Sequence, residues 1–354
     1  MKARVTIAII LLVGLLLRAG CSHHGDLFQL AAQGRTRAVR TLIGSGGAVS
    51  GQDRYGRTPL MHAVYFGHAD AARLLLDAGA DVDAQDRAGS TPLLWAIQGG
   101  SAAAVRLLLS RGADASRGDR EGYTPLMHAC SLGRRKIVDL LLRARADVNA
   151  RDRYGFPALM FAVWKRHADL AEILLEAGAD VNARNTWGAS CLMNACGLKD
   201  RTLVRLLLDW EADTGIRDRD GLGALCYAAK RKDQRIIQIL MERMPEPQPV
   251  GPDGLVALCY HIEKGSVGRV QELLDVGVDV NAAGPSGLTP LAIAVDRNRP
   301  DLVLVLLSAG AAADAVCGDG ESALAMAIRK GYGKIADMLR TSRGQQGVPS
   351  GTGS

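Results

Sequence analysis

The hexapeptide Thr-Pro-Leu-Met-His-Ala occurs twice in this chain, at residues 58–63 and again at residues 124–129. Thr91-Pro92-Leu93 stands midway between the two copies and in the same phase. The repeat period is therefore about 33 residues, within the range of about 20–50 residues that is typical of solenoids. In a solenoid each unit packs only against its neighbours. Chain length alone would predict two or three globular domains, but the repeat predicts a solenoid instead.

Nine units of this length can be aligned without a gap, and an in-phase half-unit precedes them. Every unit has a glycine three residues after its first residue and a leucine seven residues after it. A leucine-rich pair follows later in each of the first eight units, as at Leu75-Leu76. The units start at Asp53, Asp86, Asp119, Asp152, Asn185, Asp218, Gly251, Gly284 and Cys317.

Each unit is predicted to hold a turn and two short helices. In residues 53–85, Asp-x-x-Gly predicts the turn, because glycine supplies the positive φ that such turns need. Thr58 and Pro59 predict the N-cap and the first residue of a helix that Gly67 ends. A second helix follows, with an apolar stripe formed by Ala71, Ala72, Leu75 and Leu76. One helix pair cannot bury this stripe alone, so the neighbouring units must cover it.

These residues resemble the ankyrin repeat. The resemblance rests on Asp-x-x-Gly-x-Thr-Pro-Leu, on Gly67-His68 and on Leu-Leu-Leu-x-x-Gly-Ala-Asp-Val-Asn/Asp, and it covers residues 24–340. It implies an all-α solenoid of about nine to ten units, each made of two antiparallel helices and a hairpin finger. It also implies protein binding by a concave side that fingers and first helices line. Enzymatic activity is not expected of such a chain.

The chain departs from the ankyrin pattern in several places. Arg145 and Glu211 replace the glycine that should end the second helix, at a cost of about 1 kcal/mol if the left-handed conformation is kept. Three prolines within residues 244–250 rule out an ordinary finger, because proline lacks a backbone donor. We therefore expect N-terminal repeats over residues 22–243, an atypical finger and weak joint at 244–252, and C-terminal repeats over 253–340. Arg340 marks a polar cap, and a disordered tail is expected at residues 341–354.

Residues 1–21 are predicted to be a signal peptide. Lys2 and Arg4 precede an apolar run at residues 5–17 that is too short for a membrane-spanning helix. Ala-Gly-Cys at residues 19–21 resembles the end of a bacterial lipobox, in which Cys21 carries the lipid, although Arg18 is unusual there. We expect an exported protein of the periplasm or cell envelope, anchored to the membrane as a lipoprotein. A cleaved soluble periplasmic form and an uncleaved anchor are the alternatives.

Charge and cysteine usage narrow the possible functions. The net charge of +6 falls to +3 without the three cations of the leader, which leaves 40 basic against 37 acidic residues. Such a small excess does not indicate nucleic-acid binding. The seven cysteines do not predict disulfides, since Cys226 and Cys259 stand at the same position of adjacent units. Stacked helices lie about 8–10 Å apart, beyond the reach of a disulfide, so we expect small core residues.

No enzyme signature is present. Residues 44–47 read Gly-Ser-Gly-Gly but lack the Lys-Ser/Thr of a phosphate-binding loop. There is no HExxH, GxSxG or paired CxxC motif, and His23-His24 is better explained as a solvated linker than as a metal site. We expect no catalytic residues, no cofactor, no metal and no small-molecule substrate.

Two columns of variable positions are candidates for binding. An arginine follows the first residue of four successive units, at Arg54, Arg87, Arg120 and Arg153. These side chains either pair with nearby aspartates at solvated fingertips or form a rim for carboxylates of a partner. The second column lies within the first helices and carries His62, Trp95, His128, Phe161, Asn194, Tyr227 and Tyr260. Lateral packing between first helices is the alternative explanation for this second column.

Aromatic residues gather at the fingers and first helices. More than half of the aromatic residues of the chain stand at such positions outside the second column: Tyr55, Tyr65, Phe66, Tyr123, Tyr154, Phe156, Trp164 and Trp187. Because aromatic residues and arginine dominate binding hot spots, we expect these eight, the four arginines, Trp95 and Phe161 to bind a partner. Later units, with Asp253 at a fingertip, are expected to be stacking support.

Two hypotheses about the partner follow from these residues. The first is a scaffold or inhibitor that binds another protein of the cell envelope through its concave face. The second is a structural factor that binds a non-protein polyanion such as peptidoglycan or lipopolysaccharide. The aromatic residues favour the protein partner, whose identity the sequence does not give, and a sharp salt dependence would favour the polyanion.

Overall fold

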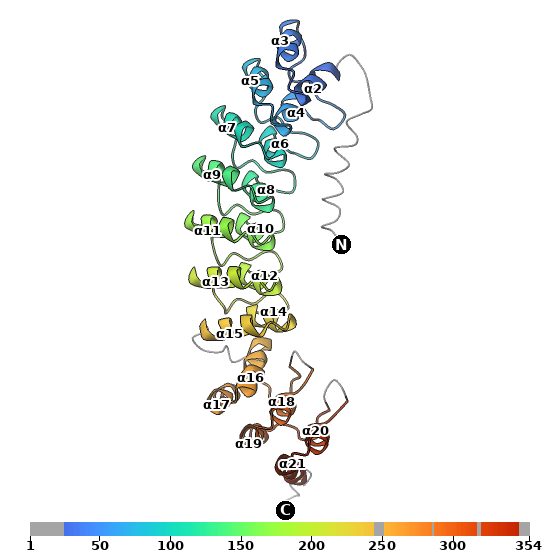
Figure 1. The fold of residues 1–354 in the computed structure, drawn as a ribbon, viewed down its shortest axis with the longest axis vertical. Helices are drawn as coiled ribbons and strands as arrows, with labels where there is room; N and C mark the ends of the chain where they lie inside the picture. The colour runs from blue at the N-terminus through green and yellow to red at the C-terminus, as the bar shows by residue number, and fades with distance from the viewer. Residues whose placement is uncertain (1–24, 244–250, 285–286, 317–319, 347–354) are drawn as a thin grey trace, which may run out of the picture. The chain divides into compact units, whose positions relative to one another are not determined.

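The computed structural model describes residues 25–243, 251–284, 287–316 and 320–346 (Figure 1). Within these residues the chain forms 20 helices and no strand, so the expected all-α solenoid is confirmed. The predicted signal peptide with Cys21, residues 244–250 of the atypical finger and residues 347–354 of the tail lie outside the described residues. None of the described helices is long and apolar enough to span a membrane.

The chain divides into two compact units, residues 1–153 and 154–354. The first unit contains α2 (Gly25–Ala32), α3 (Thr36–Gly44), α4 (Pro59–Tyr65), α5 (Ala69–Asp77), α6 (Pro92–Gly99), α7 (Ala102–Ser110), α8 (Pro125–Ser131) and α9 (Arg135–Arg143). The second begins with α10 (Ala158–Trp164), α11 (Ala168–Glu176), α12 (Cys191–Gly197), α13 (Arg201–Asp209), α14 (Ala224–Lys230) and α15 (Gln234–Arg243). It continues with α16 (Pro252–Lys264), α17 (Val267–Asp275), α18 (Pro290–Asp296), α19 (Pro300–Ser308), α20 (Ala323–Arg329) and α21 (Gly333–Gln346).

Within each unit, first helices stack on first helices and second helices on second helices, as Figure 1 shows for α4 and α6 and for α5 and α7. The predicted core is confirmed, because Leu60 and Leu75 are completely buried and the same holds for their equivalents in the next repeat. This burial is what stabilises the array, since helices of seven to nine residues are too short to be stable alone in water.

The predicted helix starts are also confirmed. The Thr58 hydroxyl accepts a hydrogen bond from the Met61 backbone N–H, and Pro59 occupies the first turn. The same cap recurs at Thr91, Thr124, Ser190, Thr289 and Ser322. Such a side-chain acceptor satisfies one of the backbone donors that every helix leaves unpaired at its start.

Where a repeat begins with an aspartate, as at Asp53, Asp86 and Asp119, that side chain holds the finger. The Asp53 carboxylate accepts hydrogen bonds from the backbone N–H groups of Tyr55 and Arg57, and Gly56 has a φ of 78°. Adjacent fingers are then joined by one backbone hydrogen bond, as from Arg87 N to Tyr55 O at 3.0 Å. The turn that the sequence predicts is thus both a local element and a contact between repeats.

Two helix ends keep a left-handed conformation without glycine. Arg145 and Glu211 each have a φ of 60°, so the predicted strain at these positions is present. The same conformation occurs at Arg166, Lys199, Lys232 and Asn298, after first helices where other repeats have a glycine such as Gly67. Packing of the repeats therefore imposes this turn even on residues with a Cβ atom.

The repeat that follows the prolines differs from the others. Its first helix, α16, starts at Pro252 and has 13 residues, against seven in α14. Asp253, expected at a fingertip, is instead in the first turn of this helix and is only 1% exposed. The expectation of a fingertip there is wrong because the finger of this repeat is replaced by helix. Whether a weak joint exists at residues 244–252 stays a prediction.

The C-terminal helix extends further than expected. α21 runs to Gln346, past the predicted start of the tail at residue 341. The exposed Arg340 side chain pairs with Asp337 at 3.0 Å, and the Thr341 hydroxyl donates to the Asp337 carbonyl. Local polar contacts of this kind stabilise the last turns of the helix.

Candidate functional site

Two side chains of the second column, Trp95 and Tyr227, fold back onto the aspartate that begins their own repeat. Trp95 Nε1 donates to Asp86 Oδ2 at 3.0 Å, and the Tyr227 hydroxyl donates to Asp218 Oδ2 at 2.8 Å. A side chain at this position of the first helix therefore holds the finger against the helix. The sequence analysis considered only partner binding and packing between first helices for this column.

The histidines at this position lie near the same carboxylate. His62 Nε2 is 3.6 Å from Asp53 Oδ2, and His128 Nε2 is 3.8 Å from Asp119 Oδ2. His62 is buried, so it contributes to packing between finger and helix rather than to an open surface.

The turn carboxylates are stabilised as anions. Burial raises the pKa of Asp53, but the His62 imidazole, the Arg57 side chain and two backbone N–H groups outweigh it and hold the pKa well below its usual value. Asp119 has a lowered pKa because its own histidine and backbone N–H groups outweigh burial in the same way. On the donor side, burial and the hydrogen bond to Asp218 raise the pKa of Tyr227 to about 12. These groups are structural and are not poised for proton transfer near neutral pH.

The four arginines of the first column are exposed fingertips of the first unit. Their backbone N–H groups join neighbouring fingers, as from Arg120 to the Ala88 carbonyl at 3.1 Å and from Arg153 to the Glu121 carbonyl at 3.0 Å. The Arg153 side chain pairs with Glu121 at 2.6 Å, and the Arg54 guanidinium lies 4.8 Å from the Tyr55 ring centre. The pairing expected at solvated fingertips is therefore seen at Arg153, with a glutamate of the adjacent finger.

Three aromatic side chains of the first unit, Tyr65, Phe66 and Trp95, form a cluster. Tyr65 contacts Phe66 and Trp95 edge-on, with ring centres 5.1 and 5.5 Å apart. Phe66 and Tyr55 are 43% and 41% exposed. Tyr123 is separate, since it packs against His128 at 4.3 Å and burial raises its pKa.

Fingers of the second unit carry another aromatic cluster. Tyr154 and Trp187 are stacked with ring centres 6.0 Å apart, and Phe156 meets the edge of Trp187 at 5.9 Å. Trp187 is 52% exposed. Phe161 is different, because only 6% of it is exposed and its ring packs 5.7 Å from Phe156. We therefore place Phe161 in the core, which corrects its sequence-based assignment as a binding anchor.

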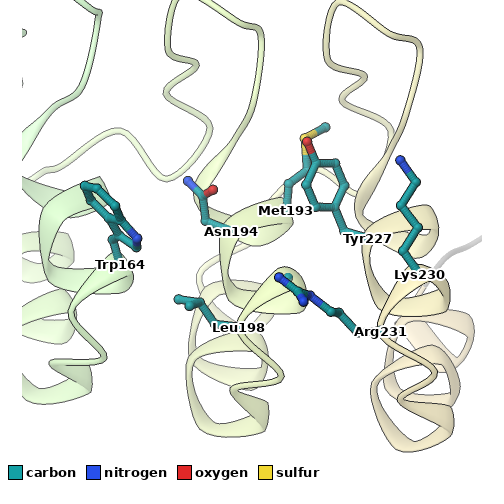
Figure 2. A pocket seen from close by; sticks show the side chains of 8 residues that line it. Trp164, Met193, Asn194, Leu198, Tyr227, Lys230 and Arg231 are labelled. Atoms are coloured by element: carbon teal, nitrogen blue, oxygen red, sulfur yellow. The ribbon is translucent and has the colours of Figure 1, made fainter. Parts of the chain in front are cut away.

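A groove of about 460 Å³ lies along the first helices of the second unit. Figure 2 shows its side chains coming from three successive first helices, α10, α12 and α14. Trp164 forms one end and is 52% exposed. The lining residues are Trp164, Met193, Asn194, Gly197, Leu198, Tyr227, Lys230 and Arg231.

The groove combines apolar surface with positive charge. Met193 is buried below it, and Leu198 follows the end of α12. Lys230 Nζ lies 6.0 Å from the Tyr227 ring centre, and Lys165 Nζ lies 5.7 Å from the Trp164 ring centre. Cations placed over aromatic faces are held loosely by the ring quadrupole and remain open to an anion.

Among the residues that the sequence predicts for partner binding, Trp164 alone lines this groove. Leu198, Lys230 and Arg231 were missed, although Lys230 stands at the same register position as Trp164 and the other two stand one position later. Comparing those register positions across repeats would have found them. Asn194 and Tyr227 were noted in the second column but not assigned to the site.

Nothing in the described residues indicates catalysis or metal binding. They contain no group of three or more His, Cys, Asp or Glu side chains that could hold a metal ion. Five cysteines in this part of the chain are free and buried, as predicted, and burial raises the pKa of Cys130 to about 12. A thiol of this kind is not a nucleophile at neutral pH.

Comparisons with known proteins agree with the fold. A family model described as ankyrin repeats (3 copies) matches in overlapping segments that reach from residue 11 to residue 347: 11–86, 27–119, 81–152, 113–185, 159–250, 192–284 and 258–347. No curated protein matches the chain.

Two similar solved structures are also ankyrin repeat domains. The human ASB11 ankyrin repeat domain is 31% identical, with a TM-score of 0.57, and the match covers 62% of this chain and 98% of that one. The ankyrin repeat domain of Bcl-3, described as a unique member of the IkappaB protein family, is 30% identical, with a TM-score of 0.57. That match covers 63% of this chain and all of the other.

Proposed function

We propose that this chain, which belongs to the ankyrin repeat family, is a scaffold or inhibitor that binds another protein through its fingers and first helices. Ankyrin repeats are protein-binding modules, and no feature of the described residues points to chemistry. The finer parts of this function, namely the location in the cell envelope and the partner, are our proposals.

The exposed aromatic residues of the second unit are the observation that carries the proposal. Trp164 and Trp187 are each 52% exposed, and Tyr154 is 40% exposed. Rings of this size contribute large contact areas and lose little side-chain entropy on binding. Trp187 is also held in place by its contacts with Tyr154 and Phe156. Exposed rings of this size are suited to anchor a protein partner.

We further propose that the protein is exported and attached to the membrane through a lipid on Cys21. Support comes from the cationic start, the short apolar run and the Ala-Gly-Cys sequence of residues 1–21. Mass spectrometry of the mature protein tests this directly. A lipid-modified Cys21 as the first residue is expected, whereas a mature chain that starts at Ser22 or later without lipid would exclude the lipoprotein.

A capture experiment tests the protein-binding function. The full chain is used to capture proteins from a cell-envelope extract, and the recovered set is compared with that of the Trp164→Ala and Trp187→Ala variants. Trp210→Ala is the matched control, because Trp210 is also exposed but ends the second helix α13. A specific partner should be lost with Trp164→Ala or Trp187→Ala and kept with Trp210→Ala. Equal recovery by all three variants would contradict the proposed surface.

A further inference from the structure

We propose that the groove of α10, α12 and α14 binds an extended acidic segment of a protein. An aliphatic or aromatic side chain of that segment would pack on Trp164, and its carboxylates would lie beside Lys230 and Arg231. This assignment rests on the protein-binding function proposed above and adds the chemistry of the partner.

The cations of the groove have no anionic partner of their own. Within the described residues, neither Lys230 nor Arg231 forms an ion pair with a carboxylate, and the same is true of Lys165 beside Trp164. Asp218 accepts from Tyr227 and Asp233 pairs with Arg201 at 3.2 Å, so these two carboxylates are already engaged. The residues that line the groove thus include two cations and no carboxylate.

Later repeats of the same unit show that a cation at the register position of Arg231 can be neutralised internally. Arg297, at the end of α18, lies 3.5 Å from Glu263, and Lys330, at the end of α20, lies 2.7 Å from Asp296. The carboxylate comes in each case from the preceding repeat. The groove lacks this arrangement, because α12 has Gly197 at the position that Glu263 and Asp296 hold in their own repeats.

The fold does not require the cations at these helix ends. A positive charge near a helix C-terminus is favourable through the helix dipole. The equivalent positions of the first unit nevertheless carry uncharged residues, namely Tyr65-Phe66, Gln98-Gly99 and Ser131-Leu132. These helices form without basic residues there. The positive charge of the groove is therefore a property of this surface and not of the repeat.

The uncharged part of the groove favours a polypeptide over a simple polyanion. Trp164 and Leu198 give an apolar surface to a side chain, and the Asn194 amide has no hydrogen-bond partner among the described residues. An amide both donates and accepts, so it matches the N–H and C=O groups of an extended backbone. Carboxylates on that backbone then meet Lys230 and Arg231, which gives complementary charge.

A displayed library of short random peptides tests the proposal with the full chain as bait. Selected sequences should be rich in Asp and Glu and should contain an aliphatic or aromatic residue. Fluorescence anisotropy with one labelled peptide of that kind then measures affinity. Selection of neutral or basic sequences would overturn the proposal.

Variants of the groove give the second readout. Lys230→Glu and Arg231→Glu should each weaken peptide binding by about 10-fold or more, as expected for charges that face a carboxylate. Trp164→Ala should weaken it similarly, and Trp164→Phe should restore most of the affinity. Lys334→Glu is the matched control, because Lys334 is exposed on α21, away from the groove-lining residues, and should bind like the wild type. Circular dichroism melting checks that each variant is folded.

Non-peptide anions separate the alternatives. Lipopolysaccharide and heparin, used as competitors, should displace the peptide only weakly. The acidic-segment proposal would be overturned if the chain bound no peptide but bound one of these polyanions tightly through Lys230 and Arg231. Poly-aspartate that binds as well as the selected peptides would do the same, since it has no apolar anchor. Suppose that capture of a protein is lost with Trp187→Ala while its affinity is unchanged by Arg231→Glu. In that case the proposed function stands and the acidic-segment proposal fails.

Discussion

Asp253 caps a helix of the preceding repeat: its Oδ1 accepts a hydrogen bond from the backbone N–H of Cys226 at 2.9 Å. Cys226 is the third residue of α14, the position whose N–H is bound by a threonine or serine in other repeats. The N-cap of α14 is Gly223, which has no side chain to do this. Asp253 therefore replaces the missing cap from the next repeat along the chain.

The Asp253 cap predicts a specific coupling with Gly223. A Cβ at Gly223 would lie 1.9 Å from Asp253 Oδ2, so the two side chains compete for one place. Asp253→Ala should lower the free energy of unfolding by about 2–4 kcal/mol, because it leaves the Cys226 N–H unpaired and removes the buried partner of Arg217, 3.0 Å away. Chemical denaturation measures this loss.

A second substitution keeps this prediction testable. Gly223→Thr should be destabilising in the wild type but should restore stability to Asp253→Ala, since threonine supplies a local cap. A double-mutant cycle gives the coupling free energy. If the two changes are simply additive, Asp253 does not act as the cap of α14.

The strained ends of two second helices predict stabilising substitutions. Arg145→Gly and Glu211→Gly should each raise the free energy of unfolding by up to about 1 kcal/mol, because glycine adopts their φ of 60° without steric cost. The gain should be larger at Glu211, since an anion at a helix C-terminus is unfavourable whereas the Arg145 cation is not. Gly79→Ala, at the equivalent end of α5 with a φ of 88°, is the control and should destabilise. Stability unchanged or lowered by both glycine variants would contradict this account.

The lowered pKa of Asp53 predicts a local loss of stability in acid. Its pKa is below the ordinary 3.8 in the folded chain, so the unfolded chain binds the proton more tightly. The stabilisation is fully present above the ordinary pKa and is lost as the pH falls through the folded value. Amide hydrogen exchange of residues 53–66 should therefore show protection that decreases more steeply below about pH 4 in the wild type than in Asp53→Asn. Parallel profiles for the two proteins would show that the carboxylate contributes nothing.

Two aromatic residues of α10 should respond in opposite ways. Phe161→Ala should cost about 3–5 kcal/mol of stability, because its ring is buried. Trp164→Ala should change stability by less than about 1 kcal/mol but should reduce partner binding by about 2 kcal/mol or more, because its ring is half exposed. Thermal melting and binding measured on the same samples separate the two effects. If Phe161→Ala left the stability unchanged but weakened partner binding, Phe161 would be a binding residue after all.

Much of the fold could be predicted because similar local signals recur from repeat to repeat. Thr58, Pro59 and Gly67 each have a local effect on the backbone, so their positions in the sequence were sufficient. Asp253 could not be interpreted in this way, since its role depends on the absence of a side chain at Gly223 in another repeat. Its burial is a tertiary effect that the local pattern misplaced at a fingertip.

The candidate site was less accessible to sequence reasoning than the fold. Exposed aromatic residues were identified correctly at Trp164 and Trp187, but the same criterion included Phe161, whose ring is buried. Residue type alone does not separate an exposed ring from a buried one at the variable positions. Comparing register positions across repeats would have brought up Lys230 and Arg231. That no carboxylate pairs with them could not be predicted, because it depends on how the side chains of neighbouring helices are arranged.

Site-specific photo-crosslinking in the groove tests the central claim most directly. A photoreactive amino acid at position 198, between Trp164 and Arg231 in Figure 2, is compared with the same group at Glu172, which is exposed on the second helix α11. We expect an adduct with one protein from position 198 only, and mass spectrometry of that adduct should place the crosslink in an acidic segment. Adducts that form equally well from position 172, or that form from neither position while the chain is folded and captures its partner, would contradict the assignment of this groove.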